Sequence, residues 1–186
     1  PSRRACVFLK EELINTLSGA SFLPKIVSIE SYIQELADIK LIDNTKLLFE
    51  FYSVYKLITP DKEVEPFDVF SQWATIALHD FNEIDSYLID SNSLFENLND
   101  LNKVNEWFSD EDPSLIAKNY LNFLEKLGNL YKYLYALLKS HKFGYQGLIY
   151  REAVENLEFY IEQNSEKHIA FIGFNALNRA EENIFQ

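Results

Sequence analysis

The sequence lacks methionine, has a single cysteine, Cys6, and contains no long apolar run. One cysteine excludes an internal disulfide and a cysteine-based metal cluster, and it favours a reducing compartment, so we expect a cytoplasmic protein. Without methionine there is no initiator residue, so we expect the chain to begin inside a longer protein or after processing. No run approaches the ~20 apolar residues that span a bilayer, and no basic-then-apolar leader opens the chain, so no membrane partner is expected.

Glycine and proline are scarce as well, with five residues of each among 186. This is too few for a turn-rich all-β fold and is consistent with long helices. The 15 Phe and 11 Tyr residues, within a hydrophobic fraction of 47%, supply enough apolar material for a packed core.

Basic residues are few, because 17 Lys and Arg stand against 29 Asp and Glu, which gives a net charge of -12. Proteins draw most of their affinity for nucleic acids from cations that neutralise phosphates. The free chain is therefore a poor candidate for tight DNA binding by itself. Any contact with nucleic acid must be local, or must rely on other parts of a parent protein.

Apolar residues recur at the spacing of amphipathic helices over most of the chain. The first helix is predicted from Ser2, which can cap it, to a turn at Ser18 and Gly19. Near the other end, Asn178 and Glu181 form a capping-box-like pair that opens the last helix. The helices predicted between them cover residues 30–37, 45–58, 66–88, 91–98, 113–138 and 146–163.

Two segments have the character of strands. Residues 25–29 are rich in β-branched side chains, which favour extended backbone. Residues 168–174 form a continuous apolar run without a helical period, which is typical of a strand buried on both faces in a parallel sheet. We therefore expect a mainly α fold with few short parallel strands, at about 25–29 and 168–173, and a long helical segment between them.

No complete catalytic motif is present: GxSxG, GxxxxGK[ST] and GxGxxG are all absent, and the histidines have no metal-binding spacing. We therefore expect no enzyme activity, no metal and no cofactor for this chain alone. The densest group of carboxylates, in residues 80–85, is interpreted as a solvated acidic helix face, because no Gly-containing loop accompanies it as in a calcium site.

Arg3 and Arg4 stand at a predicted helix N-terminus, where cations oppose the helix dipole. Either an anion is bound there, or the two are surface arginines near a chain end, and the residues alone favour neither reading. Residues 145–151, Tyr-Gln-Gly-Leu-Ile-Tyr-Arg, are interpreted as a helix-entry turn with packed tyrosines, and no chemistry follows from them.

Several stretches, in order along the chain, resemble the N-terminal, helicase-like region of the AddB-like proteins of Bacteroidetes-type bacteria. These are RecB-family helicase–nucleases, with a helicase-like front and a PD-(D/E)XK nuclease at the back. The stretches that carry the resemblance are residues 1–5, 23–30, 80–87, 145–151 and 171–177 with Glu181.

The resemblance implies DNA contacts at two places. In superfamily 1 helicases a Pro/Ser/Arg-bearing helix start, motif Ia, contacts single-stranded DNA, and this chain has Ser2, Arg3 and Arg4 there. Motif Ib, on the next strand, also touches DNA, and Ser28 stands at the place of its threonine. Glu30 replaces a histidine of that motif, and a glutamate that faced a phosphate would repel it.

The apolar run at 168–174 resembles the strand that ends in the Asp-Glu pair of a Walker B motif. Gly173, Phe174 and Asn175 stand in place of that pair. Without it there is no Mg²⁺ ligand and no carboxylate to orient an attacking water. The Walker A segment is expected before Pro1, and the nuclease beyond Gln186, so the resemblance implies a decayed, non-catalytic helicase domain.

The resemblance further implies a partial RecA-like α/β subdomain over 1–42 and 164–186, with 43–163 as a helical insertion. It implies a bacterial module of DNA repair and recombination with a structural or DNA-guiding role in double-strand break processing. The expected partners are the rest of the parent chain with its nuclease domain, an AddA-like helicase subunit and single-stranded DNA. The acidic charge and aromatic helix faces favour an alternative, a helical protein–protein interaction scaffold without a nucleic-acid role.

Overall fold

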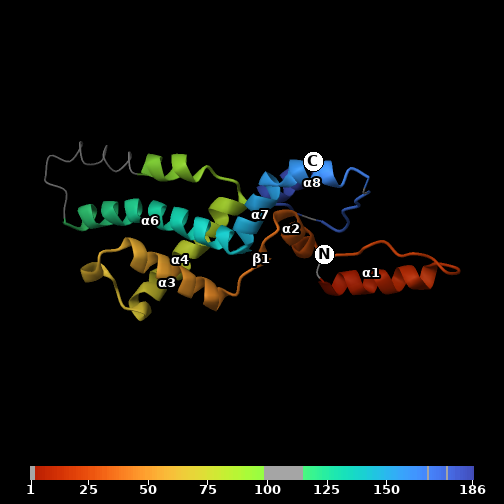
Figure 1. Ribbon diagram of the computed structural model, residues 1–186, viewed down its shortest axis with the longest axis horizontal. Helices are drawn as coiled ribbons and strands as arrows, with labels where there is room; N and C mark the ends of the chain where they lie inside the picture. The colour runs from red at the N-terminus through yellow and green to blue at the C-terminus, as the bar shows by residue number, and fades with distance from the viewer. Residues whose placement is uncertain (1–2, 99–114, 167, 175) are drawn as a thin grey trace.

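The computed structural model describes residues 3–98, 115–166, 168–174 and 176–186. These residues are mainly helical, with one small parallel sheet (Figure 1). Residues 91–98 are one helical segment. The other helices are α1 (Arg3–Thr16), α2 (Ile29–Ala37), α3 (Asn44–Ile58), the 3-10 helix η1 (Asp61–Glu63), α4 (Phe67–Ser86), α6 (Leu115–Ser140), α7 (Gln146–Glu155), α8 (Leu157–Gln163) and α9 (Arg179–Phe185).

Side chains next to the helix starts set several of these boundaries. Ser28 caps α2 and Asp43 caps α3, each by accepting hydrogen bonds from backbone N–H groups of the first turn. The predicted capping box of the last helix is confirmed. Asn178 accepts from the Glu181 N–H at 2.8 Å, and the Glu181 carboxylate accepts from the Asn178 N–H at 3.0 Å.

The core lies where α3, α4, α6 and α7 meet. Phe51 of α3 is fully buried, and its ring centroid lies 5.3 Å from that of Phe70 and 5.8 Å from that of Phe81, both on α4. Leu134 of α6 and Leu148 of α7 are also fully buried. Burial of each of these side chains stabilises the fold by about 1.5–3 kcal/mol.

The central helix is α7, which packs against α4, α2 and α9. Its close approach to α4 depends on Gly147, because a β-carbon there would lie 2.2 Å from the backbone oxygen of Asn82. The Gly147 N–H donates to the Asn82 side-chain oxygen at 2.8 Å. The helix predicted over 146–163 is divided into α7 and α8, and Asn156 at the junction donates a side-chain hydrogen bond to the Ala37 carbonyl.

The sheet consists of β1 (Lys40–Leu41) and β2 (Phe143–Gly144), paired in parallel with Lys40 opposite Phe143. The strands predicted at 25–29 and 168–173 are wrong for this structure, because neither segment is assigned as a strand and Ile29 already belongs to α2. The physical reason is that a strand needs a hydrogen-bonded neighbour. In the described part of the chain, neither segment pairs with a strand.

The segment 168–174 instead lies against α2 and α9 through aromatic side chains, and Phe171 contacts both helices. The Phe171 ring centroid lies 5.6 Å from that of Tyr32 on α2 and 4.2 Å from that of Phe185 on α9. Ile169 and Ile172 remain exposed. Part of the apolar surface of this run is therefore left exposed to solvent.

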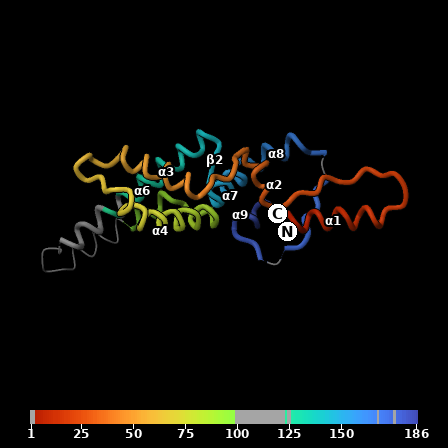
Figure 2. Tube along the Cα trace, turned by 90° about the horizontal axis from the view of Figure 1, so that it is seen from below, coloured from red at the N-terminus to blue at the C-terminus, as the bar shows by residue number. Residues whose placement is uncertain are grey.

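Helix α1 extends away from the rest of the molecule in both views (Figures 1 and 2). It contains no buried residue, although its sequence is amphipathic. Its exposed apolar side chains are Val7, Phe8, Leu9 and Ile14.

The predicted division into 1–42 with 164–186 and a separate 43–163 stays a prediction. In the structure α7, from the middle segment, packs against α2 and α9, which come from the two terminal segments.

Candidate functional site

The two arginines of the predicted DNA contact lie in the first turn of α1, and both are exposed. The first turn contains no acidic residue. The Arg4 guanidinium carbon lies 5.7 Å from the centroid of the Phe8 ring, in cation–π geometry. Ser2 lies outside the described residues, so its predicted role stays a prediction.

Ser28 is placed differently from an exposed contact residue, because only 3% of its surface is accessible. Its hydroxyl accepts the Ser31 N–H at 3.3 Å and lies 3.0 Å from the Ser31 hydroxyl. The side chain thus serves as the N-cap of α2. Glu30, in the first turn of α2, is exposed.

Arg3 also lines a groove of about 450 Å³ between the start of α1, the end of α2 and the turn from α6 into β2. The groove brings together basic residues that are far apart in the sequence. Besides Arg3 they are Lys40, His141 and Lys142. The sequence gives no signal for this grouping, because a His-Lys pair after a helix is ordinarily a favourable match to the helix dipole.

The acidic residues of the groove are already paired. Glu35 lies 2.7 Å from Lys25, whose pKa is raised by this hydrogen bond, and Asp38 lies 2.5 Å from Lys142. The C-terminal ends of α2 and α6 add partial negative charge, which Lys142 offsets. Within the described residues, the Arg3 and Lys40 side chains form no ion pair. These two cations of the groove are therefore not neutralised by a carboxylate of the described part of the chain.

Gly173 and Phe174, which the resemblance sets in place of a Walker B pair, do not line the Arg3 groove. Gly173 has a φ of +83°, and a β-carbon there would meet nothing within 4 Å. Phe174 packs against Phe185 of α9, with ring centroids 4.9 Å apart. Asn175 lies outside the described residues.

A buried polar cluster joins two of the stretches that carry the family resemblance, residues 80–87 and 145–151. Asp85, on α4, is fully buried, and its carboxylate accepts hydrogen bonds from Tyr131 at 2.5 Å and Tyr145 at 2.5 Å. Arg151 of α7 donates to it through Nε at 2.6 Å. The same guanidinium donates to the carbonyls of Ile84 and Ile89 at 3.0 and 2.7 Å.

This cluster is where the sequence interpretation was wrong. The carboxylates at 80–85 were expected to form a solvated face, and Asp80 and Glu83 are indeed exposed. Asp85 instead points into the core, because α7 brings Arg151 to it from 66 positions away in the sequence. Burial raises the pKa of the Asp85 carboxyl, while Tyr131, Tyr145 and Arg151 oppose that change.

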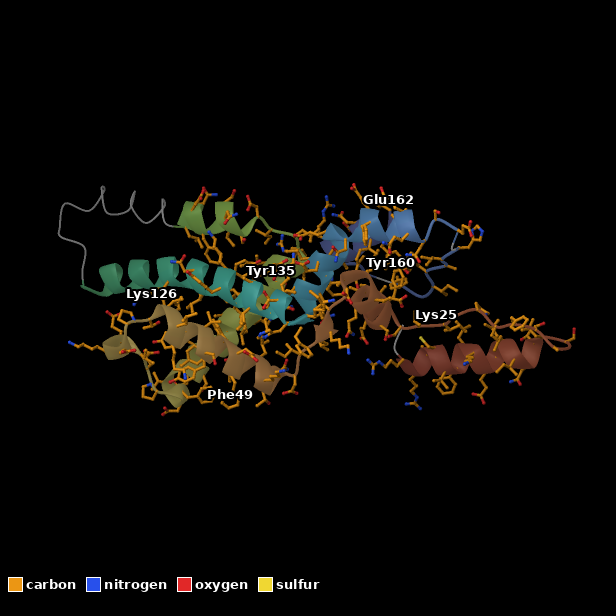
Figure 3. The ribbon with its side chains drawn as sticks, viewed as in Figure 1. Lys25, Phe49, Lys126, Tyr135, Tyr160 and Glu162 are labelled. Carbon is orange, nitrogen blue, oxygen red and sulfur yellow. The ribbon has the colours of Figure 1, made fainter. Side chains whose placement is uncertain are left out.

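A second polar pair lies nearby between α6 and α7. Glu152 is 2% exposed, and its Oε1 accepts from Tyr135 at 2.6 Å and lies 2.6 Å from the Lys139 ammonium. Figure 3 shows Tyr135 on α6, and this residue is partly buried. The hydrogen bond to Glu152 raises the pKa of Lys139. The two carboxylates, Asp85 and Glu152, are buried and hydrogen-bonded, whereas Lys139 is half exposed, so the clusters fix the packing of α7 against α4 and α6.

The described residues contain no group of three or more His, Cys, Asp or Glu side chains that could hold a metal ion. Among the described helices, none has both the length and the apolar character to cross a membrane.

No protein-family model, curated protein or solved structure matches this chain.

Proposed function

We propose that this chain is a non-catalytic, helicase-like module of a bacterial DNA end-processing helicase–nuclease. Its role is structural, or it guides single-stranded DNA during double-strand break repair and recombination. In this proposal residues 1–42 and 164–186 are a partial RecA-like unit, and residues 43–163 are its helical insertion.

The observation that supports a DNA-guiding role is the position of Arg3. It is exposed at the start of α1, beside Arg4, and lines a groove that also gathers Lys40 and Lys142. On a chain of net charge -12, such a local concentration of cations is what a phosphate backbone requires.

Non-catalytic character is supported by the residues in place of a Walker B pair. Gly173, Phe174 and Asn175 supply no carboxylate, so the acidic pair that would hold Mg²⁺ and orient an attacking water is missing from the sequence. The partners proposed are the rest of the parent chain, including its PD-(D/E)XK nuclease, an AddA-like helicase subunit and single-stranded DNA.

The test is DNA binding by the parent protein with Arg3 and Arg4 both replaced by alanine. We expect weaker binding of single-stranded DNA and a smaller dependence of affinity on salt, because two phosphate contacts are lost. The control removes the same charge elsewhere, by alanine at the exposed residues Arg179 and Lys132. Equal binding by the Arg3/Arg4 variant and the wild type would remove the DNA-guiding role.

A second function, a helical protein–protein interaction scaffold, is favoured by the exposed apolar side chains of α1. Val7 is 65% exposed and Phe8 57%, and α1 buries no residue. A pull-down that recovers only protein partners, unchanged by nuclease treatment, would favour this function. A loss of partners after nuclease treatment would favour the DNA module.

A further inference from the structure

A second cavity, of about 550 Å³, lies between the end of α3, η1, α4 and α6 and shares no lining residue with the Arg3 groove. Figure 3 shows Lys126, one of its lining residues, on α6, and its ammonium reaches Glu63 of η1. Three aromatic side chains from three different helices line the cavity. They are Tyr55, Trp73 and Phe123.

The aromatic rings meet edge to face. The Trp73 centroid lies 5.6 Å from that of Tyr55 at an interplanar angle of 73°, and 5.5 Å from that of Phe123 at 87°. An aromatic ring that lines a cavity attracts an organic cation placed over its face, because the negative face of the π system interacts with positive charge.

Two carboxylates stand at the same cavity, on a segment that is held by hydrogen bonds. Trp73 Nε1 donates to the Glu65 carboxylate at 2.9 Å, and the Glu65 N–H donates to the Tyr55 hydroxyl at 3.3 Å. The Tyr55 hydroxyl donates to the Glu63 carbonyl at 3.3 Å. The aromatic residues that line the cavity therefore also fix the acidic segment in place.

The end of a helix adds to the negative potential. Ile58 is the last residue of α3, Thr59 is its C-cap, and both line the cavity. A helix C-terminus carries partial negative charge and stabilises nearby cations.

The cavity contains one cation from the chain itself. The Lys126 ammonium lies 2.7 Å from the Glu63 carboxylate, and the two side chains are 47% and 57% exposed. An exposed pair of this kind contributes little stability, so another cation can compete for Glu63 at small cost. Glu65 forms no ion pair within the described residues, which leaves one carboxylate in surplus over the lysine.

We propose that this cavity binds an organic cation, either a guanidinium or ammonium side chain of a partner protein or a free polyamine. The cation lies against Trp73 and Phe123 and pairs with Glu65. Lys126 competes with it for Glu63. This site is independent of the DNA-guiding proposal, because it is lined by different residues and takes a ligand of opposite charge.

The test uses the full chain with Trp107 replaced by phenylalanine, so that Trp73 is the sole tryptophan. N-acetyl-arginine amide and spermidine are titrated separately while tryptophan fluorescence is recorded. We expect a saturable change with at least one of them. Tighter binding of the arginine probe identifies a protein side chain as the ligand, and tighter binding of spermidine identifies a polyamine.

Three variants decide whether the fluorescence reports this site. Glu65→Gln keeps an acceptor for Trp73 but loses the charge, and it should weaken binding about fivefold. Lys126→Ala removes the competing cation and should tighten binding, which a purely structural ion pair would not do. Lys132→Ala, on an exposed part of the same helix, should change nothing. Absence of a saturable change with both probes, or equal affinity of Glu65→Gln and the parent chain, would overturn the proposal.

Discussion

Arg151 and Asp85 form a buried ion pair across α7 and α4, with Nε 2.6 Å from Oδ1 and with the Asp85 side chain fully buried. Two tyrosine hydroxyls complete the shell of the carboxylate. A buried ion pair of this kind adds little net stability compared with apolar residues, but removal of one partner is costly. The pair therefore makes the packing of α4 against α7 sensitive to single substitutions.

Arg151→Ala should lower the free energy of unfolding by about 3–5 kcal/mol, because it leaves the Asp85 carboxylate buried without a counter-charge. Urea denaturation followed by circular dichroism measures the change. Asp85→Asn in the Arg151→Ala background should restore part of the loss, since the amide removes the unpaired charge. No recovery in the double variant would mean that the carbonyl contacts of Arg151 carry the effect.

Gly147→Ala should lower the free energy of unfolding by about 1–3 kcal/mol or more. The new methyl group would overlap the Asn82 backbone oxygen and force α7 away from α4. Gly173→Ala is the matched comparison. It meets no atom within 4 Å, and only its left-handed φ of +83° should cost about 1 kcal/mol. The thermal unfolding midpoints of the two variants measure the difference in stability. An equal loss of stability at both positions would contradict the close approach of α7 to α4.

The protein should lose stability as the pH rises above 10. Burial raises the pKa of Tyr150 to about 12, and that of Tyr145 well above its ordinary value. Between the unfolded value near 10 and these higher values the folded state holds more protons than the unfolded state, so the free energy of unfolding falls with rising pH. Phenolate absorbance and circular dichroism should change together.

If the phenolate signal of all 11 tyrosines developed while the circular dichroism stayed unchanged, the buried hydroxyls would not be part of the folding equilibrium.

Asn178→Ala should fray α9, at a cost of about 1 kcal/mol, because the N-cap of its capping box is lost. Glu181 also accepts a hydrogen bond from Tyr150 of α7 at 3.0 Å, so the loosened helix would uncover part of α7. Hydrogen exchange should quicken in residues 179–185. Asn183→Ala, inside the same helix, is the control and should have little effect.

The sequence by itself determined the features whose causes are local. Helical periodicity predicted α2, α3 and α4 nearly to the residue, and Asn178 with Glu181 predicted the last helix start. These signals work because backbone caps and apolar spacing act within one or two helical turns.

Only the tertiary structure decided which distant residues meet. Lys40 pairs with Phe143 across the two short strands, and Asp85 meets Arg151 in the core, and neither partner is marked in the sequence. The apolar run at 168–174 carries the composition of a strand, but composition does not supply a neighbour for its hydrogen bonds. A helix satisfies its own backbone, whereas a strand or a buried ion pair is defined by a second segment that local sequence does not specify.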